Sequence, residues 1–262
     1  MRGISGKNVI VSAGSSGLGR GIAGVMAGYG ANVTVFSRSE RKLSDTVSEI
    51  KGKTGTEINA VKADLSNRAE LEKVIHSAHE RYGPINFLVM NYGDPKVAPF
   101  LEISEEEWNK SIDMMLRSTL MLTRSVLDDM LKQKAGRIVY VTSMTTKNPL
   151  ENFSISASLR SAVVALGKVL SLELASEGIN VNSISQGFFM TDRLRNIARQ
   201  NSEKRGIGYD QALDAIKQTI PMKRFGEPGD LGELVAFLCA EESSYITGTN
   251  MQIDGGIVKF PF

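Results

Sequence analysis

The sequence has little of the residue types that mark disulfide-bonded and metal-binding proteins. Among 262 residues there are one cysteine, Cys239, and two histidines, so no disulfide can form within the chain. Cys239 falls in an apolar helical stretch, which favours a buried thiol over a nucleophile. His76 and His79 lie three positions apart on an expected helix, but no cysteine or third histidine accompanies them. We therefore expect no metal site, and a solvated helix face at the two histidines.

Net charge and long apolar runs are also scarce. The 31 basic and 29 acidic residues leave a net charge of +2, which argues against a dedicated nucleic-acid or membrane-surface protein. No apolar run approaches the length of a membrane span, and the N-terminus leads into an expected strand without a signal-peptide pattern. These features favour a cytoplasmic protein with neither a membrane nor a nucleic acid as partner.

The most informative stretch, residues 9–29, predicts a strand, a glycine loop and a helix. The loop, Ser12 to Gly19, reads Ser-Ala-Gly-Ser-Ser-Gly-Leu-Gly. Such a loop lets backbone N–H groups approach an anion, and the following helix directs its free N–H groups to the same place, so the expected ligand is a phosphate. The spacing of Gly14, Gly17 and Gly19 is G-x-x-G-x-G, not G-x-G-x-x-G, and a tight turn that binds nothing is the alternative.

Strand-like apolar runs recur along the chain and alternate with helical patterns. The expected strands cover residues 9–11, 32–36, 58–61, 87–90, 138–141, 181–184 and 251–253. Alternating strands and helices without hairpin turns predict parallel βαβ units. The expected fold is therefore α/β: one Rossmann-type domain, residues 1–262, with a doubly wound, mostly parallel seven-stranded sheet and helices on both faces.

Two segments between the strands have features of their own. Ser104 to Glu107 forms an S-x-x-E capping box and predicts the start of a long helix that reaches about Met130. Residues 187–221 interrupt the alternation with a largely helical insertion at the carboxyl edge of the sheet, where ligands bind in such folds. We expect a substrate lid there, whose apolar face suits a partly hydrophobic substrate or, alternatively, serves only for packing.

With these motifs in place, the whole chain resembles the short-chain dehydrogenase/reductase family, especially its 3-oxoacyl-carrier-protein-reductase-like branch. The matches are Ser12–Gly19 for T-G-x-x-x-G-x-G, Asp64 for the acid after the third strand, Asn91-Tyr92-Gly93 for N-A-G, Ser143 for the catalytic serine, Gly187 with Thr191 for P-G-x-x-x-T, and a similar C-terminal tail from Arg224 to Gly256. The cofactor-binding residues that the resemblance implies are Ser12, Gly14, Ser15, Ser16, Gly17, Leu18, Gly19, Ser37, Arg38, Asp64, Leu65, Asn91, Gly93, Arg160, Gly187 and Thr191.

The sequence departs from the family pattern at the catalytic residues. The Y-x-x-x-K motif falls on Ser156 to Arg160, so Ser156 replaces the tyrosine and Arg160 the lysine, and Met115 stands at the asparagine. The glycine loop has Ala13 where the family has glycine, and Gln186 replaces a proline. The resemblance therefore implies Ser143, Ser156 and Arg160 as the catalytic set, with a proton route that does not use tyrosine.

Two interpretations of the function stay open at this point. The first is an oxidoreductase acting on a carbonyl/alcohol pair, in which Ser143 orients the substrate and Tyr92 or Lys147 is a candidate proton donor. Tyr140 is expected in the core, because on a regular strand its side chain points away from the face of Ser143. The second is a silent nucleotide-binding protein that acts as a sensor or subunit partner.

The end of the second expected strand favours NADP(H) over NAD(H). Dinucleotide sites for NAD carry an acid about twenty residues past the glycine loop, but this chain has Ser37 and Arg38 there. An arginine suits a 2′-phosphate, although a solvated charge at a helix start is the alternative, and Glu40 lies nearby.

The resemblance also implies a homo-oligomer, either a tetramer or a dimer. Apolar positions beyond those expected to face the sheet support it, and they are Met114, Met121, Leu122, Val126, Val164 and Leu172.

Overall fold

The structure, a computed structural model, describes residues 1–260 and has seven strands and nine α-helices within that range. The strands are β1 (Asn8–Ser12), β2 (Asn32–Ser37), β3 (Asn59–Lys62), β4 (Phe87–Met90), β5 (Gly136–Ser143), β6 (Ile179–Gln186) and β7 (Asn250–Ile253). The helices are α1 (Gly17–Gly28), α2 (Glu40–Thr54), α3 (Arg68–Tyr82), α4 (Glu105–Ile112), α5 (Ser118–Gln133), α6 (Ser154–Leu174), α7 (Asp192–Arg205), α8 (Tyr209–Gln218) and α9 (Pro228–Cys239).

The strands form one sheet in the order β3-β2-β1-β4-β5-β6-β7, and each pair of neighbouring strands is parallel. From β1 the chain first adds β2 and β3 on one side and then returns to add β4 on the other, so the strand order reverses between β1 and β4. A doubly wound sheet binds its ligands at such a switch point, outside the carboxyl ends of the strands. The expected fold class and all seven expected strands are confirmed.

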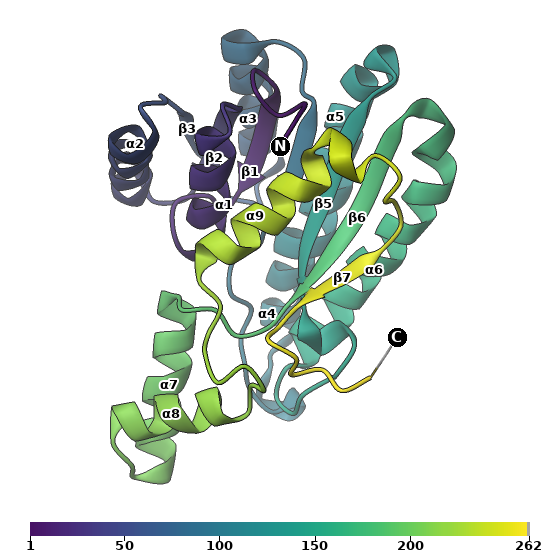
Figure 1. The fold of residues 1–262 in the computed structure, drawn as a ribbon. Coiled ribbons are helices and arrows are strands. Elements are labelled where there is room, and N and C mark those ends of the chain that lie inside the picture. Colours follow the sequence, from purple (N-terminus) through teal and green to yellow (C-terminus); the bar gives the residue numbers. More distant parts are fainter. Residues whose placement is uncertain (261–262) are drawn as a thin grey trace.

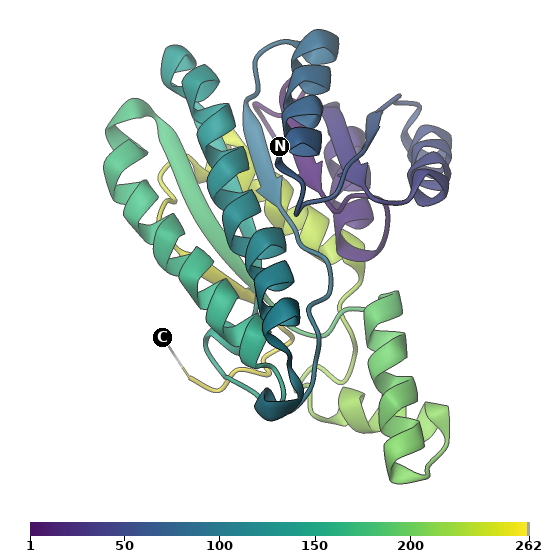
Figure 2. The same ribbon diagram turned by 180° about the vertical axis from the view of Figure 1, so that it is seen from behind.

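Helices cover both faces of the sheet (Figures 1 and 2). In Figure 1, α1 and α9 lie in front of the sheet, and Figure 2 shows α3, α5 and α6 on the opposite face. Side chains of β1 alternate between the two layers: Val9 and Val11 pack with α1 and α9, whereas Ile10 packs with the other helices. Burial on both faces explains why the strands read as continuous apolar runs.

The long helix expected from Ser104 begins as predicted but is not uniform. Ser104 and Glu107 form a reciprocal capping box at the start of α4. A π-helical turn, Asp113–Arg117, then separates α4 from α5, and Met115 within it is fully buried. The buried positions Ser111, Met115, Leu122 and Val126 lie four or seven residues apart, so one face of the segment packs inward through the π turn.

Burial along this face corrects the apolar surface expected on α5. Leu122 and Val126 have no exposed surface and pack in the core beneath the sheet. The large apolar side chains that do reach the surface on α5 and α6 include Leu120, Val169 and Leu172, which are 41%, 50% and 72% exposed.

The long helix α6 also differs from expectation, because one apolar stretch does reach the length of a membrane span. By length and composition, Ser154–Glu177 could cross a membrane, and among residues 1–260 no other helix meets that test. Its buried residues Ile155, Leu159, Val163 and Gly167 recur every four positions and face β5 and β6. Much of the apolar content of α6 therefore serves to pack the helix against the core.

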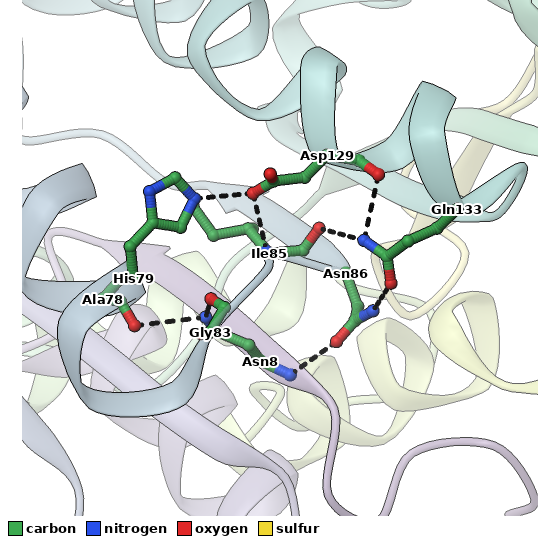
Figure 3. A network of polar contacts seen from close by, with 8 residues as sticks. All are labelled: Asn8, Ala78, His79, Gly83, Ile85, Asn86, Asp129 and Gln133. Atoms are coloured by element: carbon green, nitrogen blue, oxygen red, sulfur yellow. Dashed lines mark hydrogen bonds and ion pairs between the residues drawn. The ribbon is translucent and has the colours of Figure 1, made fainter.

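A polar network closes the amino edge of the sheet, opposite to the ligand edge (Figure 3). The Asp129 carboxylate of α5 lies 2.6 Å from His79 Nε2 and accepts the Ile85 N–H at 2.9 Å. Asn86 and Gln133 extend the network toward β1. His79 is therefore partly buried and bonded to Asp129, which corrects the expectation of a solvated face there, whereas His76 pairs with Glu80 on the surface.

Candidate active site at the carboxyl edge

A cavity of about 320 Å³ opens at the carboxyl edge of the sheet, between the glycine loop, the ends of β4, β5 and β6, and α7. The predicted site residues that line it are Ser16, Gly17, Leu18, Asn91, Gly93, Ser143, Ser156, Arg160, Gly187 and Thr191. The predicted residues outside its lining are Ser12, Gly14, Ser15, Gly19, Ser37, Arg38, Asp64 and Leu65. The cavity thus joins all three expected catalytic residues to one half of the expected cofactor set.

The glycine loop has the backbone expected of an anion site. Ala13 and Gly17 have φ of +48° and +50°, and a Cβ on Gly19 would collide with the backbone of Ala13. Ser16, the N-cap of α1, donates no side-chain hydrogen bond to the helix and accepts none from its first turn. The first N–H groups of α1 are therefore left for a ligand at the mouth of the cavity.

Two of the predicted loop residues serve the fold instead of facing the cavity. Ser12 is fully buried, and its hydroxyl accepts the Asn91 N–H at 2.8 Å and donates to the Asn91 carbonyl. The Ser15 carbonyl accepts the Thr46 hydroxyl at 3.0 Å. Ser12 thereby fixes the residue that follows β4 against the end of β1.

The end expected to hold the adenosine part lies on β2 and the loop after β3. The Ser37 hydroxyl is buried without a hydrogen-bond partner among the described residues. Arg38 is exposed, with Nε 3.9 Å from Asp64 Oδ2. Burial opposes ionisation of Asp64, but hydrogen bonds from Ser66 and the charge of Arg38 outweigh it and lower the pKa of this carboxyl. An unpartnered hydroxyl next to an exposed guanidinium with one long ion pair fits a phosphorylated ribose.

The two serines of the catalytic set lie on either side of Thr145. The Ser143 Oγ, at the end of β5, accepts the Thr145 N–H at 3.2 Å. The Ser156 Oγ, on α6, lies 3.3 Å from the Thr145 hydroxyl. Ser156 is buried and Ser143 is half-buried, and both face the cavity. Three hydroxyl-bearing residues therefore gather where the resemblance places a substrate carbonyl.

Arg160 is a buried cation at the floor of the cavity. It is 8% exposed, its Nη1 donates to the Val141 carbonyl at 3.0 Å, and its guanidinium lies 5.4 Å from the centre of the Tyr92 ring. Its Nε is buried without a partner, and no carboxylate among residues 1–260 forms an ion pair with it. Burial, and then the charge of Arg193, lower the pKa of Arg160 to about 10, so it remains charged near neutral pH.

The three other proton-donor candidates do not offer a proton to the cavity. Tyr140 is fully buried in the core as expected, bonded to Thr123. Lys147 is half-buried and does not contribute to the cavity lining. Tyr92 lines the cavity with its ring, but its hydroxyl lies 2.7 Å from the Thr119 Oγ1.

The proton of the Tyr92 hydroxyl is committed to this bond. Because Thr119 donates its own proton to the Met115 carbonyl at 2.5 Å, Tyr92 must donate to Thr119. Burial raises the pKa of Tyr92 to about 12.

The insertion after β6 supplies cavity residues that the sequence patterns did not single out. Thr191 caps α7, accepting the Leu194 N–H, and lies close to Gly17 of the glycine loop. Two residues later, Arg193 Nη1 pairs with Asp94 Oδ1 at 2.8 Å, and both line the cavity. Asp94 directly follows the N-A-G position and Arg193 comes two residues after the threonine of P-G-x-x-x-T, and this closeness to a motif was the available signal. The ion pair joins α7 to the loop after β4 across the cavity.

A family model described as enoyl-(acyl carrier protein) reductase matches residues 12–258, nearly the whole chain. The chain belongs to the short-chain dehydrogenase/reductase family. The oxidoreductase UcpA of Salmonella typhimurium is 36% identical over 256 residues, which cover 97% of this chain and 95% of that protein. The 3-oxoacyl-[acyl-carrier-protein] reductase FabG of Staphylococcus epidermidis is 32% identical, covering 96% and 98%. The expected family and its reductase-like branch are confirmed.

Solved structures of this family superpose over nearly the full length. A variant of actinorhodin polyketide ketoreductase with NADPH gives a TM-score of 0.93 at 28% identity, covering 99% of this chain and 100% of the other. L-Sorbose reductase from Gluconobacter frateurii, complexed with NADPH and L-sorbose, gives 0.92 at 27% identity, covering 98% of each. These short-chain dehydrogenase/reductase neighbours, named with NADPH, support the expected cofactor.

Proposed function

We propose that this protein is an NADP(H)-dependent oxidoreductase that interconverts a small carbonyl compound and its alcohol without a tyrosine as proton donor. One observation carries the proposal: a single cavity joins the glycine loop and the free end of α1 to Ser143 and the buried cation Arg160. When bound, NADP(H) supplies or accepts the hydride, and the residues of the chain position the substrate and balance charge.

The residues of the site fit such a cofactor. The glycine loop and the first turn of α1 hold its diphosphate, and Ser37 and Arg38 hold the 2′-phosphate, for which the unpartnered Ser37 hydroxyl is a ready donor. Arg160 holds the ribose next to the nicotinamide, because one of its five N–H groups is committed to Val141 and its Nε is free.

Ser143 orients the substrate carbonyl. It accepts a hydrogen bond from the Thr145 N–H, so its own hydroxyl proton is available to the cavity. Such a donor polarises the carbonyl and stabilises negative charge that develops on its oxygen.

Ser156 occupies the position of the family's tyrosine but is a poor acid near neutral pH, so the proton that converts the alkoxide to the alcohol comes from solvent water. General acid catalysis contributes about 10²–10⁴-fold, so we expect slow turnover or substrates that need little acid assistance. The charged Arg160 favours the developing alkoxide without giving up its proton.

An assay of NADPH oxidation tests the proposal, run on ketones, aldehydes, quinones and 3-oxoacyl thioesters beside a fluorescence titration with NADPH. Saturable binding with turnover of at least one carbonyl supports it. Saturable binding with no turnover on the whole panel would instead favour the silent nucleotide-binding protein, and no binding would exclude both.

The proposal also covers the location of the protein in the cell, its assembly and its substrate lid. It places the protein in the cytoplasm as a homo-oligomer, a tetramer or a dimer, whose contacts include the exposed apolar side chains of α5 and α6, among them Leu120, Val169 and Leu172. Residues 187–221 serve as the substrate lid, since the beginning of this insertion and the first turns of α7 within it both line the cavity. Light scattering of the protein in dilute buffer tests the assembly against the monomer mass of 28.5 kDa.

A further inference from the structure

The charges that face the cavity do not balance. Lys42, Arg160 and Arg193 all line it, and the charge of Arg193 is close enough to lower the pKa of Arg160. The carboxylate of Asp94 pairs with Arg193, while Asp192 is directed to Arg195 at 3.2 Å. Within residues 1–260, two guanidinium groups therefore share one carboxylate at this end of the cavity.

The excess charge is held where water cannot neutralise it. Arg160 is more than nine-tenths buried, and its Nε has no partner among the described residues. A buried charge without a counter-ion is costly, so proteins keep one mainly where a ligand supplies the opposite charge. The Tyr92 ring stabilises the cation but does not neutralise it.

The position of the two arginines indicates that the substrate, and not the cofactor, supplies the missing negative charge. The phosphates of a dinucleotide have their own donors at the glycine loop and at Arg38, whereas Arg160 lies on the same helix as Ser156 and stacks beside the end of β4. Arg193 comes from the insertion that covers the cavity, and its side chain is 28% exposed. An excess of one positive charge matches a monoanion, and guanidinium groups bind carboxylates through paired hydrogen bonds.

We propose that the substrate is an oxo acid or the corresponding hydroxy acid, whose carboxylate binds at Arg193, close to the buried charge of Arg160, while its carbonyl or hydroxyl group faces Ser143. The proposal deepens the proposed oxidoreductase function and rests on it. Arg193 thereby becomes a residue that determines specificity, and Asp94 holds it in place before the substrate carboxylate replaces or joins that contact.

Matched acid and ester pairs test this inference. Pyruvate, 3-oxobutanoate and 4-oxopentanoate are each compared with their methyl esters, which carry the same ketone without the charge, in the NADPH-oxidation assay. We expect at least one acid to exceed its ester more than tenfold in kcat/KM. Arg193→Gln should lower that acid's kcat/KM more than tenfold and change the ester's less than twofold.

Arg199→Gln is the matched control, because Arg199 lies on the same helix but is exposed, does not line the cavity and bonds the neutral Asn196. This variant should leave the ratio of acid to ester unchanged. Equal kcat/KM for every acid and its ester overturns the inference and leaves the oxidoreductase function standing. An Arg193→Gln variant that weakens NADPH binding but keeps the acid-to-ester ratio also overturns it, because Arg193 would then bind the cofactor.

A binding experiment needs no turnover. Calorimetric titration of the NADPH-loaded protein compares pentanoate with pentanamide, which have the same size and differ in charge. We expect pentanoate to bind at least tenfold more tightly, and Arg193→Gln to remove the difference. Equal affinities for the two probes contradict the inference, whereas a failure of NADPH itself to bind contradicts the proposed function.

Discussion

The guanidinium of Arg160 lies 5.4 Å from the centre of the Tyr92 ring, and this stacking assigns different roles to the two residues. The ring supports the cation from below, while the Tyr92 hydroxyl donates to Thr119 and onward to the Met115 carbonyl, away from the cavity. We therefore expect Tyr92 to position Arg160 and not to supply protons to the cavity.

Two substitutions at Tyr92 separate these roles. Tyr92→Phe keeps the ring under Arg160 and removes a buried hydrogen bond, so we expect a loss of about 1 kcal/mol in unfolding free energy with nearly unchanged NADPH affinity. Tyr92→Leu removes the aromatic face as well, and we expect NADPH to bind several-fold more weakly. Urea unfolding and fluorescence titration measure the two effects. A Tyr92→Phe protein that is folded and binds NADPH but has lost turnover would show that the phenol is the acid.

Ser143→Ala should lower turnover about 10²-fold or more while NADPH affinity changes little. In the proposed mechanism this hydroxyl is the donor to the substrate carbonyl, and among the described residues it contacts only the Thr145 N–H. Steady-state kinetics on a proven substrate and an NADPH titration provide the comparison. Full activity in this variant would place the chemistry elsewhere, with Lys147 the next residue to change.

Arg38→Asp should weaken NADPH binding more than tenfold and spare NADH. Arg38 is the exposed cation beside the unpartnered Ser37 hydroxyl, and its one charged contact among the described residues is Asp64 at 3.9 Å. An added carboxylate repels a 2′-phosphate and accepts hydrogen bonds from a 2′-hydroxyl. Titrations with both nucleotides decide the matter, and equal affinities for NADPH and NADH in the parent protein would end the idea.

Stability should fall on the alkaline side of pH 9 because of Cys239. Burial raises the pKa of this thiol to about 12 from an ordinary value near 9, so above pH 9 the unfolded chain releases a proton that the folded chain keeps. The stabilising effect is complete below pH 9 and is lost as the pH rises toward 12, by up to about 1.4 kcal/mol per pH unit.

Unfolding in guanidinium chloride at pH 8 and pH 10 measures how steeply the unfolding free energy falls with pH. Cys239→Ala should make this fall smaller, although the variant is less stable than the parent protein at pH 8. The lowered pKa of Arg160 acts in the opposite direction, but only above pH 10. Rapid reaction of the native parent protein with a thiol reagent at pH 8 would contradict the buried, protonated thiol.

Asp129→Ala should destabilise the protein by about 1–3 kcal/mol without changing the kinetics. The substitution leaves the Ile85 N–H and His79 without their shared acceptor at the amino edge of the sheet, far from the cavity (Figure 3). His76→Ala is the control, since its pair with Glu80 is exposed and contributes little. Thermal unfolding distinguishes the two variants, and an equal effect of both would mean that the network carries no stability.

The sequence by itself determined the element types and their order. A buried strand such as residues 87–90 is a short apolar run bounded by polar residues, and the S-x-x-E box at Ser104 acts within one helical turn. Such signals are local, because they depend on backbone geometry over a few residues. Alternation of strands and helices then restricts the topology, since parallel crossovers have one hand and follow few paths.

Only the tertiary structure decided which side chains meet. Leu122 and Val126 pack in the core, and the distant segments carrying Tyr92 and Arg160 came together only through packing of α6 on the sheet. Likewise, the contact of Arg193 with Asp94 depends on how the insertion after β6 closes over the loop after β4. Side-chain pairing across a sheet edge is set by the summed geometry of several loops and helices, and no local pattern in the sequence encodes it.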